Sequence, residues 1–335
     1  MRAYIELSRQ NLINNCEEIK KIVNKDIIAV VKCNAYGHGL VEISKILATQ
    51  GIKMFAVSTI EEASLLRKNL IFSPILLLGN CDNITYASNY RITLSITSIS
   101  YLKVLQKTNI PIFIHLLIDT GMNRDGISEN EIDEAMHIIK KSKMILKGIF
   151  THFASKDTYE KQLNIFNNVL DKIDTKNLII HSQATSTFQI KNDRMTAIRV
   201  GLALYGLDDN VPNLKPVLSL KTPLVNEIKI ENAAISYNQE QIQENGYIYT
   251  LPIGYGDGLK RENKYKVFIN NEILSQVGIT CMDHIMVYSK HQIDPKSVFE
   301  IFGENIQINN IANELNTIPY TIVSQLSSRL KRTIK

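Results

Sequence analysis

Eight short apolar runs alternate with amphipathic stretches between residue 8 and about residue 205 of this 335-residue chain. Continuous runs rich in β-branched residues are typical of parallel strands buried on both faces, and such strands need helices to cover them. Eight strands alternating with helices predict an α/β fold with a TIM-type (β/α)8 barrel, and a doubly wound open sheet is the alternative. The predicted strands are 27–31, 54–57, 75–78, 91–96, 112–118, 144–150, 178–181 and 196–200.

The stretches between these runs have the spacing of amphipathic helices. Ser8, Thr59 and Ser128 stand where helix N-caps are expected, and acidic residues follow in several of the first turns. The clearest predicted helices are 9–24, 40–50, 60–69, 98–107, 128–141 and 158–172.

The pattern changes between Asn213 and Pro216. Beyond this point short strand-like segments are separated by polar turns, with one helix expected at about 308–316. The predicted strands there are 217–230, 246–253, 265–270, 275–281 and 285–289. We therefore expect two domains, a barrel over 1–215 and a mostly β domain over 216–335.

Composition excludes several classes of protein. Hydrophobic residues make up 44% and charged residues 21%, which is typical of a globular chain rather than a disordered or fibrous one. The net charge of +5 is dispersed, so no nucleic-acid partner is expected. The four cysteines form no C-x-x-C pair, no histidine spacing suggests a metal site, and no long apolar segment predicts a signal or membrane span. These features favour a cytoplasmic protein.

Lys32 ends the first predicted barrel strand in the run A-V-V-K-C-N-A-Y-G-H-G at 29–39. Barrel active sites gather at the carboxyl ends of the strands, where partial desolvation favours a neutral, nucleophilic amine. Without further context the lysine could simply cap its strand. The following loop favours a ligand site, because two glycines allow close backbone approach and Tyr36 offers a hydroxyl.

This run resembles the pyridoxal 5'-phosphate (PLP) motif of the alanine racemase family. Further motifs follow in the family's order and cover essentially the whole chain. They are D-T-G-M-N-R at 119–124, T-H-F-A at 151–154, R-V-G-L-A-L-Y-G at 199–206, L-K-P-V at 214–217, P-I-G-Y-G-D-G at 252–258 and V-G-I-T-C-M-D at 277–283.

The resemblance implies a role for each matching residue. Lys32 would hold PLP as a Schiff base and act as one catalytic base, and Tyr255 from a partner subunit would be the opposite base. His152 would hydrogen-bond this tyrosine, Arg199 would face the pyridine nitrogen, and Arg124 would lie near the substrate carboxylate. Further matches on the phosphate side of the cofactor are Tyr36, Thr185, Gly201, Leu202 and Tyr320, and the backbone N–H of Met282 matches a substrate-carboxylate contact.

Elementary chemistry agrees with these roles. Racemisation removes a proton from one face of a carbon and returns it on the other, so two bases must flank the substrate. Arginine stays protonated, so Arg199 would keep the pyridine nitrogen unprotonated and weaken the cofactor as an electron sink.

The chain also departs from the family pattern. Many members have a carbamylated lysine where this chain has Leu117, so Arg124 would need another anion. Asp125, chloride or no anion at all are the alternatives. The usual Asn-Ser pair is Ala184-Thr185 here, which keeps a hydroxyl but loses an amide.

The expected function is PLP-dependent interconversion of L- and D-alanine by a homodimer, supplying D-alanine for peptidoglycan. A racemase of serine or another small amino acid is the nearest alternative. A PLP-dependent decarboxylase is disfavoured by the motifs of the second domain. A non-catalytic PLP-binding or homeostasis protein would resemble the barrel alone, without Tyr255 on a second domain.

Overall fold

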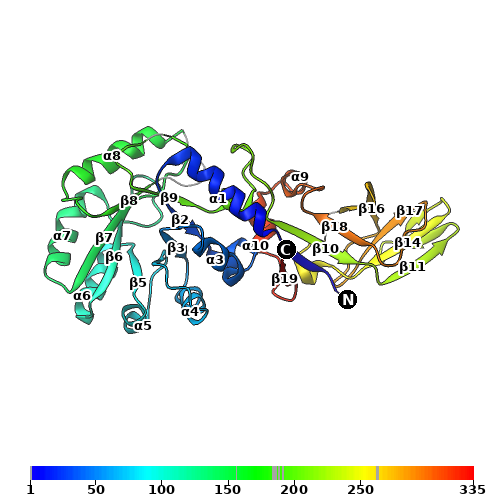
Figure 1. The fold of residues 1–335 in the computed structure, drawn as a ribbon, viewed down its shortest axis with the longest axis horizontal. Helices are drawn as coiled ribbons and strands as arrows, with labels where there is room; N and C mark the ends of the chain where they lie inside the picture. Colours follow the sequence, from blue (N-terminus) through cyan, green and yellow to red (C-terminus); the bar gives the residue numbers. More distant parts are fainter. Residues whose placement is uncertain (1, 156, 183–186, 188, 191, 262–263) are drawn as a thin grey trace. The chain divides into compact units, whose positions relative to one another are not determined.

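The computed structural model describes residues 2–155, 157–182, 187, 189–190, 192–261 and 264–335 (Figure 1). The chain forms two compact units. One comprises residues 15–35 and 40–204, and the other comprises residues 1–14, 36–39 and 205–335. Neither unit is therefore a continuous stretch of sequence.

The first unit contains an eight-stranded sheet in which every neighbouring pair is parallel. Its strand order is β8-β7-β6-β5-β4-β3-β2-β9. Just before β9, the Thr196 N–H donates to the Ile180 carbonyl in β8 at 2.9 Å, so the two edges of the sheet meet. The strands are β2 (Asp26–Val30), β3 (Met54–Val57), β4 (Ile75–Leu77), β5 (Ile92–Ile96), β6 (Ile112–Leu117), β7 (Met144–Phe150), β8 (Ile179–His181) and β9 (Ala197–Val200).

Helices precede or follow these strands, as the sequence pattern predicts (Figure 1). Thr59 caps α4 by accepting the Glu62 N–H, and the Glu131 carboxylate accepts the Ser128 N–H at 2.9 Å. The helices are α1 (Arg9–Val23), α3 (Leu40–Ala48), α4 (Ile60–Lys68), α5 (Ile84–Asn89), α6 (Ile99–Thr108), η1 (Glu129–Glu131), α7 (Ile132–Lys140) and α8 (Tyr159–Asp171). The predicted barrel is confirmed, and each predicted strand overlaps an observed one.

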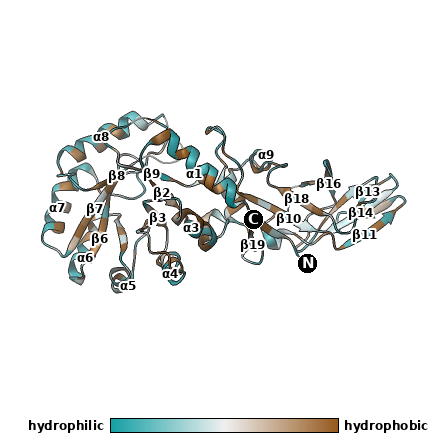
Figure 2. Ribbon diagram, in the orientation of Figure 1, coloured by the Kyte–Doolittle hydropathy of each residue, from teal (hydrophilic) through white to brown (hydrophobic). Residues whose placement is uncertain are grey.

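Burial explains why the barrel strands can be recognised in the sequence as continuous apolar runs. All residues of β3, β4, β5 and β9 are buried, because both faces of the sheet are covered. In Figure 2 the barrel strands are mostly hydrophobic, whereas the surrounding helices mix hydrophobic and hydrophilic residues.

The second unit is built on a nine-stranded sheet of order β11-β14-β17-β16-β15-β18-β10-β1-β19. The two ends of the chain meet in this sheet, where β1 pairs in parallel with β19 and antiparallel with β10. Its strands are β1 (Tyr4–Leu7), β10 (Leu218–Pro223), β11 (Asn226–Ile230), β14 (Gly246–Leu251), β15 (Lys266–Ile269), β16 (Glu272–Val277), β17 (Ile285–Ser289), β18 (Val298–Phe302) and β19 (Lys331–Ile334). A separate hairpin joins β12 (Ala233–Ile235) to β13 (Glu240–Ile242).

The predicted mostly β character of this unit is confirmed, including a helix at α9 (Ile308–Glu314). The predicted strand 217–230 is two strands, β10 and β11, with a break after Pro223. A second helix, α10 (Pro319–Ser324), begins at a proline, as first-turn prolines allow. Among the described residues, no helix has the length and apolar character that a membrane span needs.

Candidate active site

Lys32 stands two positions after the last residue of β2 and opens a turn of left-handed backbone, labelled α2 (Lys32–Tyr36). The φ angles of Cys33, Asn34, Ala35 and Tyr36 lie between 51° and 55°. This conformation costs about 1–2 kcal/mol for each residue other than glycine. Such strain persists only where neighbouring groups hold it, and it marks the turn after Lys32 as a candidate functional segment.

Two side chains of the first unit hold this turn. The Glu62 carboxylate accepts the Asn34 N–H at 3.3 Å and the Ser58 N–H at 2.9 Å. The Asn34 side chain in turn accepts the Leu40 N–H at 2.8 Å, at the start of α3. Asparagine tolerates the left-handed region better than most residues, so Asn34 suits the centre of the turn.

Arg124 lies on the loop that follows β6. Asp119 shapes this loop, because its carboxylate accepts the N–H groups of Gly121, Met122 and Asn123 at 2.9–3.1 Å. The Arg124 Nε lies 3.3 Å from a carboxylate oxygen of Asp125, and the two side chains are 60% and 49% exposed. Asp125 is therefore paired with Arg124, as one of the predicted alternatives requires, although the pair is open to solvent.

Arg199 is the buried cation of the barrel and lies on β9. Its guanidinium donates to His181 Nδ1 at 2.8 Å and to the His152 Nδ1 at 3.1 Å. It also donates to the carbonyl oxygens of His181 at 2.9 Å, Thr151 at 2.7 Å and Ser182 at 3.3 Å. All these partners are neutral acceptors. Burial, followed by the charge of Arg124, lowers the pKa of Arg199 to about 9, which leaves it a cation at neutral pH.

His152 feels the charges of the predicted cations of the barrel. Burial and, in decreasing order, the charges of Arg199, Arg124 and Lys32 together lower the pKa of His152 to about 3. Of the sequence-predicted residues of the first unit, Arg199 and His152 are therefore in direct contact, and the charges of Arg124 and Lys32 act on the same ring. Because Arg199 donates to Nδ1 of His152, the ring proton of His152 is on Nε2.

Two more histidines extend this network, and sequence reasoning missed their role. His115 Nδ1 and His181 Nε2 lie 2.8 Å apart, and both rings are fully buried. The sequence signal for this contact is Gly148. A glycine on β7, the strand between β6 and β8, leaves space in which the rings of His115 and His181 can meet.

The phosphate-side residues fall in both units. In the second unit the Tyr36 ring lies 5.5 Å from the Tyr320 ring, and burial, with a smaller effect from Asp208, raises the pKa of Tyr320. In the first unit Gly201 and Leu202 stand at the start of η2 (Leu202–Tyr205), and the first N–H groups of a helical turn lack intrahelical acceptors. Thr185, the fifth predicted residue, lies outside the described residues, as does Ala184.

Tyr255 and Met282 lie on two adjoining loops of the second unit. Tyr255 begins η3 (Tyr255–Asp257), and its N–H donates to the Cys281 carbonyl at 3.0 Å. Tyr255 is 40% exposed and Met282 is 55% exposed. Both therefore present surface that another molecule can contact.

In the described part of the chain, no group of three His, Cys, Asp or Glu side chains is arranged to hold a metal ion. Two of the buried histidines, His115 and His181, hydrogen-bond to each other, and His181 also accepts from Arg199.

Comparison with known proteins accounts for both units. Residues 7–209 match the sequence family described as alanine racemase, N-terminal domain, and residues 217–334 match alanine racemase, C-terminal domain. The chain is 32% identical to the alanine racemase of Ligilactobacillus salivarius (strain UCC118), across 99% of this chain and 96% of that protein.

Solved structures agree. The chain is similar to the alanine racemase of Clostridium difficile 630, with a TM-score of 0.93 and 31% identity, across 100% of this chain and 96% of that one. It is also similar to the histidine racemase of Leuconostoc mesenteroides subsp. sake NBRC 102480, with a TM-score of 0.91 and 25% identity, across 100% and 98%.

Proposed function

Because the chain belongs to the alanine racemase family, we propose that it interconverts L- and D-alanine with two bases, Lys32 and Tyr255. The family's enzymes are PLP-dependent isomerases. Free lysine and tyrosine side chains hold their protons at neutral pH, so the site must favour their deprotonated forms.

One observation carries this proposal: Arg199 donates to the His152 ring at 3.1 Å, and the positive charges of Arg199, Arg124 and Lys32 all act on that ring. Three cations acting on one neutral imidazole create a positive potential that suits anions. A phosphorylated cofactor and an amino-acid carboxylate are both anionic. The sign of this potential therefore matches the charge of the cofactor and of the substrate.

The chemical character of the residues also suits PLP. Arg199 makes its contacts with neutral acceptors, and a neutral pyridine nitrogen is an acceptor of the same kind. The hydroxyls of Tyr36 and Tyr320 and the N–H groups of Gly201 and Leu202 are donors suited to phosphate. When bound, PLP withdraws electrons from the substrate α-carbon and makes its proton easier to remove.

Each side chain then has a task at a stated atom. The Lys32 amine would hold the cofactor and move a proton on one face of the substrate. Arg199 would donate to the ring nitrogen and keep it unprotonated. Arg124, oriented by Asp125, would bind the substrate carboxylate, and the Met282 N–H would donate to the same group.

The tautomer of His152 supports Tyr255 as the second base. Its Nε2–H is a donor that can stabilise the deprotonated oxygen of Tyr255. The exposure of Tyr255 and Met282 is consistent with their contribution to the site of a partner subunit in the proposed homodimer with shared sites. The D-alanine made in the cytoplasm would supply peptidoglycan precursors.

A direct test is proton exchange at the α-carbon. Purified protein with PLP is incubated in deuterated water with L-alanine and, separately, with L-serine. We expect α-deuteration together with the D-enantiomer, faster with alanine, and loss of inversion in Lys32→Ala and Tyr255→Phe. Release of carbon dioxide would indicate a decarboxylase, and no exchange would indicate a non-catalytic PLP-binding protein.

A racemase of another amino acid remains the second candidate. The likeness to a histidine racemase at 25% identity supports it, because that protein has the same fold and acts on a different amino acid. Faster inversion of serine or histidine than of alanine would favour this candidate.

A further inference from the structure

The loops that carry Tyr255 and Met282 are joined by their backbones. The Tyr255 N–H donates to the Cys281 carbonyl at 3.0 Å, and the Gly256 N–H donates to the Met282 carbonyl at 2.9 Å. A Cβ atom at Gly254 would lie 2.2 Å from the Cys281 carbonyl oxygen. This glycine therefore permits the close approach that makes the two loops one structural block.

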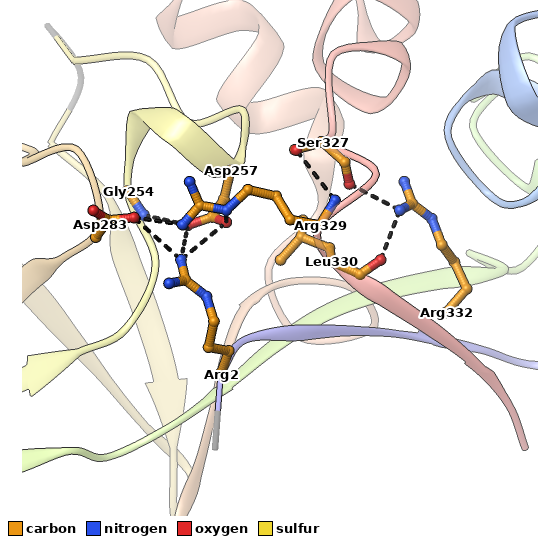
Figure 3. A network of polar contacts seen from close by, with 8 residues as sticks. All are labelled: Arg2, Gly254, Asp257, Asp283, Ser327, Arg329, Leu330 and Arg332. Carbon is orange, nitrogen blue, oxygen red and sulfur yellow. Dashed lines mark hydrogen bonds and ion pairs between the residues drawn. The ribbon is translucent and has the colours of Figure 1, made fainter.

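Beside this block lies a cluster of four charged side chains, which we call the arginine–aspartate clamp (Figure 3). Its members are Arg2, Asp257, Asp283 and Arg329. Asp257 belongs to the Tyr255 loop and Asp283 follows Met282, so the clamp has one carboxylate on each loop.

Each arginine contacts both carboxylates. Arg2 lies 3.1 Å from Asp257 and 3.3 Å from Asp283. Arg329 lies 3.1 Å from Asp257 through Nε and pairs with Asp283 through a terminal nitrogen. Arg2 makes both contacts through one terminal nitrogen, whereas Arg329 uses two nitrogens of its rigid fork, which the single point charge of a lysine cannot reproduce.

The Asp257 side chain has no solvent exposure, and it also accepts the Gly254 N–H at 3.1 Å. A buried carboxylate without cations is strongly unfavourable. The side chains of Arg2 and Arg329 are only partly exposed, at 48% and 39%. The contacts of Asp257 are therefore worth more than those of an ordinary surface ion pair.

The clamp is anchored to a further segment of the second unit. Arg332 donates to the carbonyls of Ser327 at 2.8 Å and Leu330 at 2.7 Å, on either side of Arg329 (Figure 3). The Ser327 N–H donates to the Asp257 carbonyl at 3.0 Å. Arg329 is thus presented to Asp257 from a fixed turn.

We propose that Arg2 and Arg329 are positioning residues, which through Asp257 and Asp283 fix the Tyr255 phenol and the Met282 N–H relative to one another. The inference rests on the proposed function, in which Tyr255 is a base and Met282 contacts the substrate. A displacement of about 1 Å at a reacting group can cost about 10²-fold in rate. Loosening the clamp therefore slows the half of the reaction that uses Tyr255.

The test compares α-proton exchange from the two enantiomers. Holoenzyme is incubated in deuterated water with L-alanine or D-alanine, and the ratio of the two initial exchange rates is measured. Arg329→Met should change this ratio by about 10-fold or more, because only the enantiomer deprotonated by Tyr255 is affected. Compared with Arg329→Met, Arg329→Lys should restore the melting temperature more fully than it restores the ratio of exchange rates. Lysine keeps the positive charge but cannot replace the forked donors of the guanidinium.

Two further variants separate positioning from folding. Lys290→Met removes an exposed ion pair with Glu244 in the same unit and should leave both the ratio and KM unchanged. Asp283→Asn loosens only the Met282 side, so it should raise KM for both enantiomers more than it changes the ratio. If Arg329→Met does not fold, Arg2→Met gives the same test with one arginine retained.

The outcomes are distinct. A ratio that changes in Tyr255→Phe but stays within twofold of wild type in the folded Arg2 and Arg329 variants overturns the clamp and leaves the two-base function intact. A ratio unaffected by Tyr255→Phe overturns both. Parallel changes in the Tyr255 and arginine variants support the clamp.

Discussion

Arg199 donates a hydrogen bond to Nδ1 of His181 at 2.8 Å. Since arginine cannot accept, this bond places the His181 proton on Nε2, from which it is donated to His115 Nδ1 at 2.8 Å. One cation thereby fixes the tautomers of two buried rings. The same guanidinium fixes His152 on its other side.

The three histidines are neutral for a common physical reason. Burial, followed by the charge of Arg199, lowers the pKa of His115 and of His152 to about 3 and that of His181 well below its usual range. The His115 Nε2 has no hydrogen-bond partner among the described residues, so this network ends at His115.

The first prediction concerns stability in acid. In the unfolded chain the three histidines gain protons near pH 6.5, whereas in the folded protein they stay neutral. Their contribution to stability is therefore fully present above pH 6.5 and decreases as the pH falls towards 3. Each contributes about 1.4 kcal/mol per pH unit within that window. His115→Asn keeps an acceptor for His181 but removes one titrating group, so the slope of unfolding free energy against pH should fall by about this amount.

Urea unfolding of the holoenzyme between pH 7 and pH 4.5 measures this slope. His137→Asn, at an exposed position on α7, is the matched control and should keep the wild-type slope. An equal slope in His115→Asn and wild type would show that His115 does not remain neutral in the folded state.

The second prediction concerns the glycine beside this ring. A Cβ atom on Gly148 would lie 2.6 Å from Cε1 of His115 and 2.7 Å from the Ile179 carbonyl oxygen. Gly148→Ala should therefore displace the His115 ring and destabilise the protein by about 1–3 kcal/mol. A double-mutant cycle with His115→Ala should show coupling of at least about 0.5 kcal/mol. If the effects of Gly148→Ala and His115→Ala on unfolding free energy are additive, the added methyl group is strained only against the Ile179 carbonyl.

The barrel was predictable because its information is local. Strands buried on both faces need continuous apolar runs, so 144–150 was read correctly as β7 (Met144–Phe150). Caps such as Thr59 act within one turn and mark where α4 begins.

The remainder depends on contacts between distant residues. The pairing of β1 with β19 joins the two ends of the chain, and no short window contains it. His115 and His181 are 66 positions apart and meet only once β6, β7 and β8 are in register. Arg2 and Asp257, 255 positions apart, are a similar case. The left-handed turn was also unreadable, since Cys33 and Ala35 carry no preference for that conformation.

The third prediction tests what holds that turn. Glu62→Gln keeps one oxygen acceptor and loses the other, so either the Asn34 N–H or the Ser58 N–H loses its partner. We expect a loss of about 1 kcal/mol in cofactor binding, which is about fivefold in the Kd for PLP. Absorbance titration of the apoenzyme with PLP measures this, and Glu61→Gln, at the exposed neighbouring position, should bind as wild type does. If Glu62→Gln and Glu61→Gln bind PLP with equal affinity, Glu62 does not stabilise the turn that follows Lys32.

The last prediction concerns the acidic partner of Arg124. The Arg124–Asp125 pair is about half exposed on both sides, and exposed pairs contribute about 0.2–1 kcal/mol. Asp125→Asn should therefore raise KM for alanine by up to about fivefold with little change in kcat, because it disorders the arginine proposed to bind the substrate carboxylate. The difference from wild type should shrink in 1 M salt, where exposed charges are screened within about 3 Å. A KM unchanged at low salt would mean that Arg124 is oriented without Asp125, and chloride titration at low salt would then show whether a bound anion replaces it.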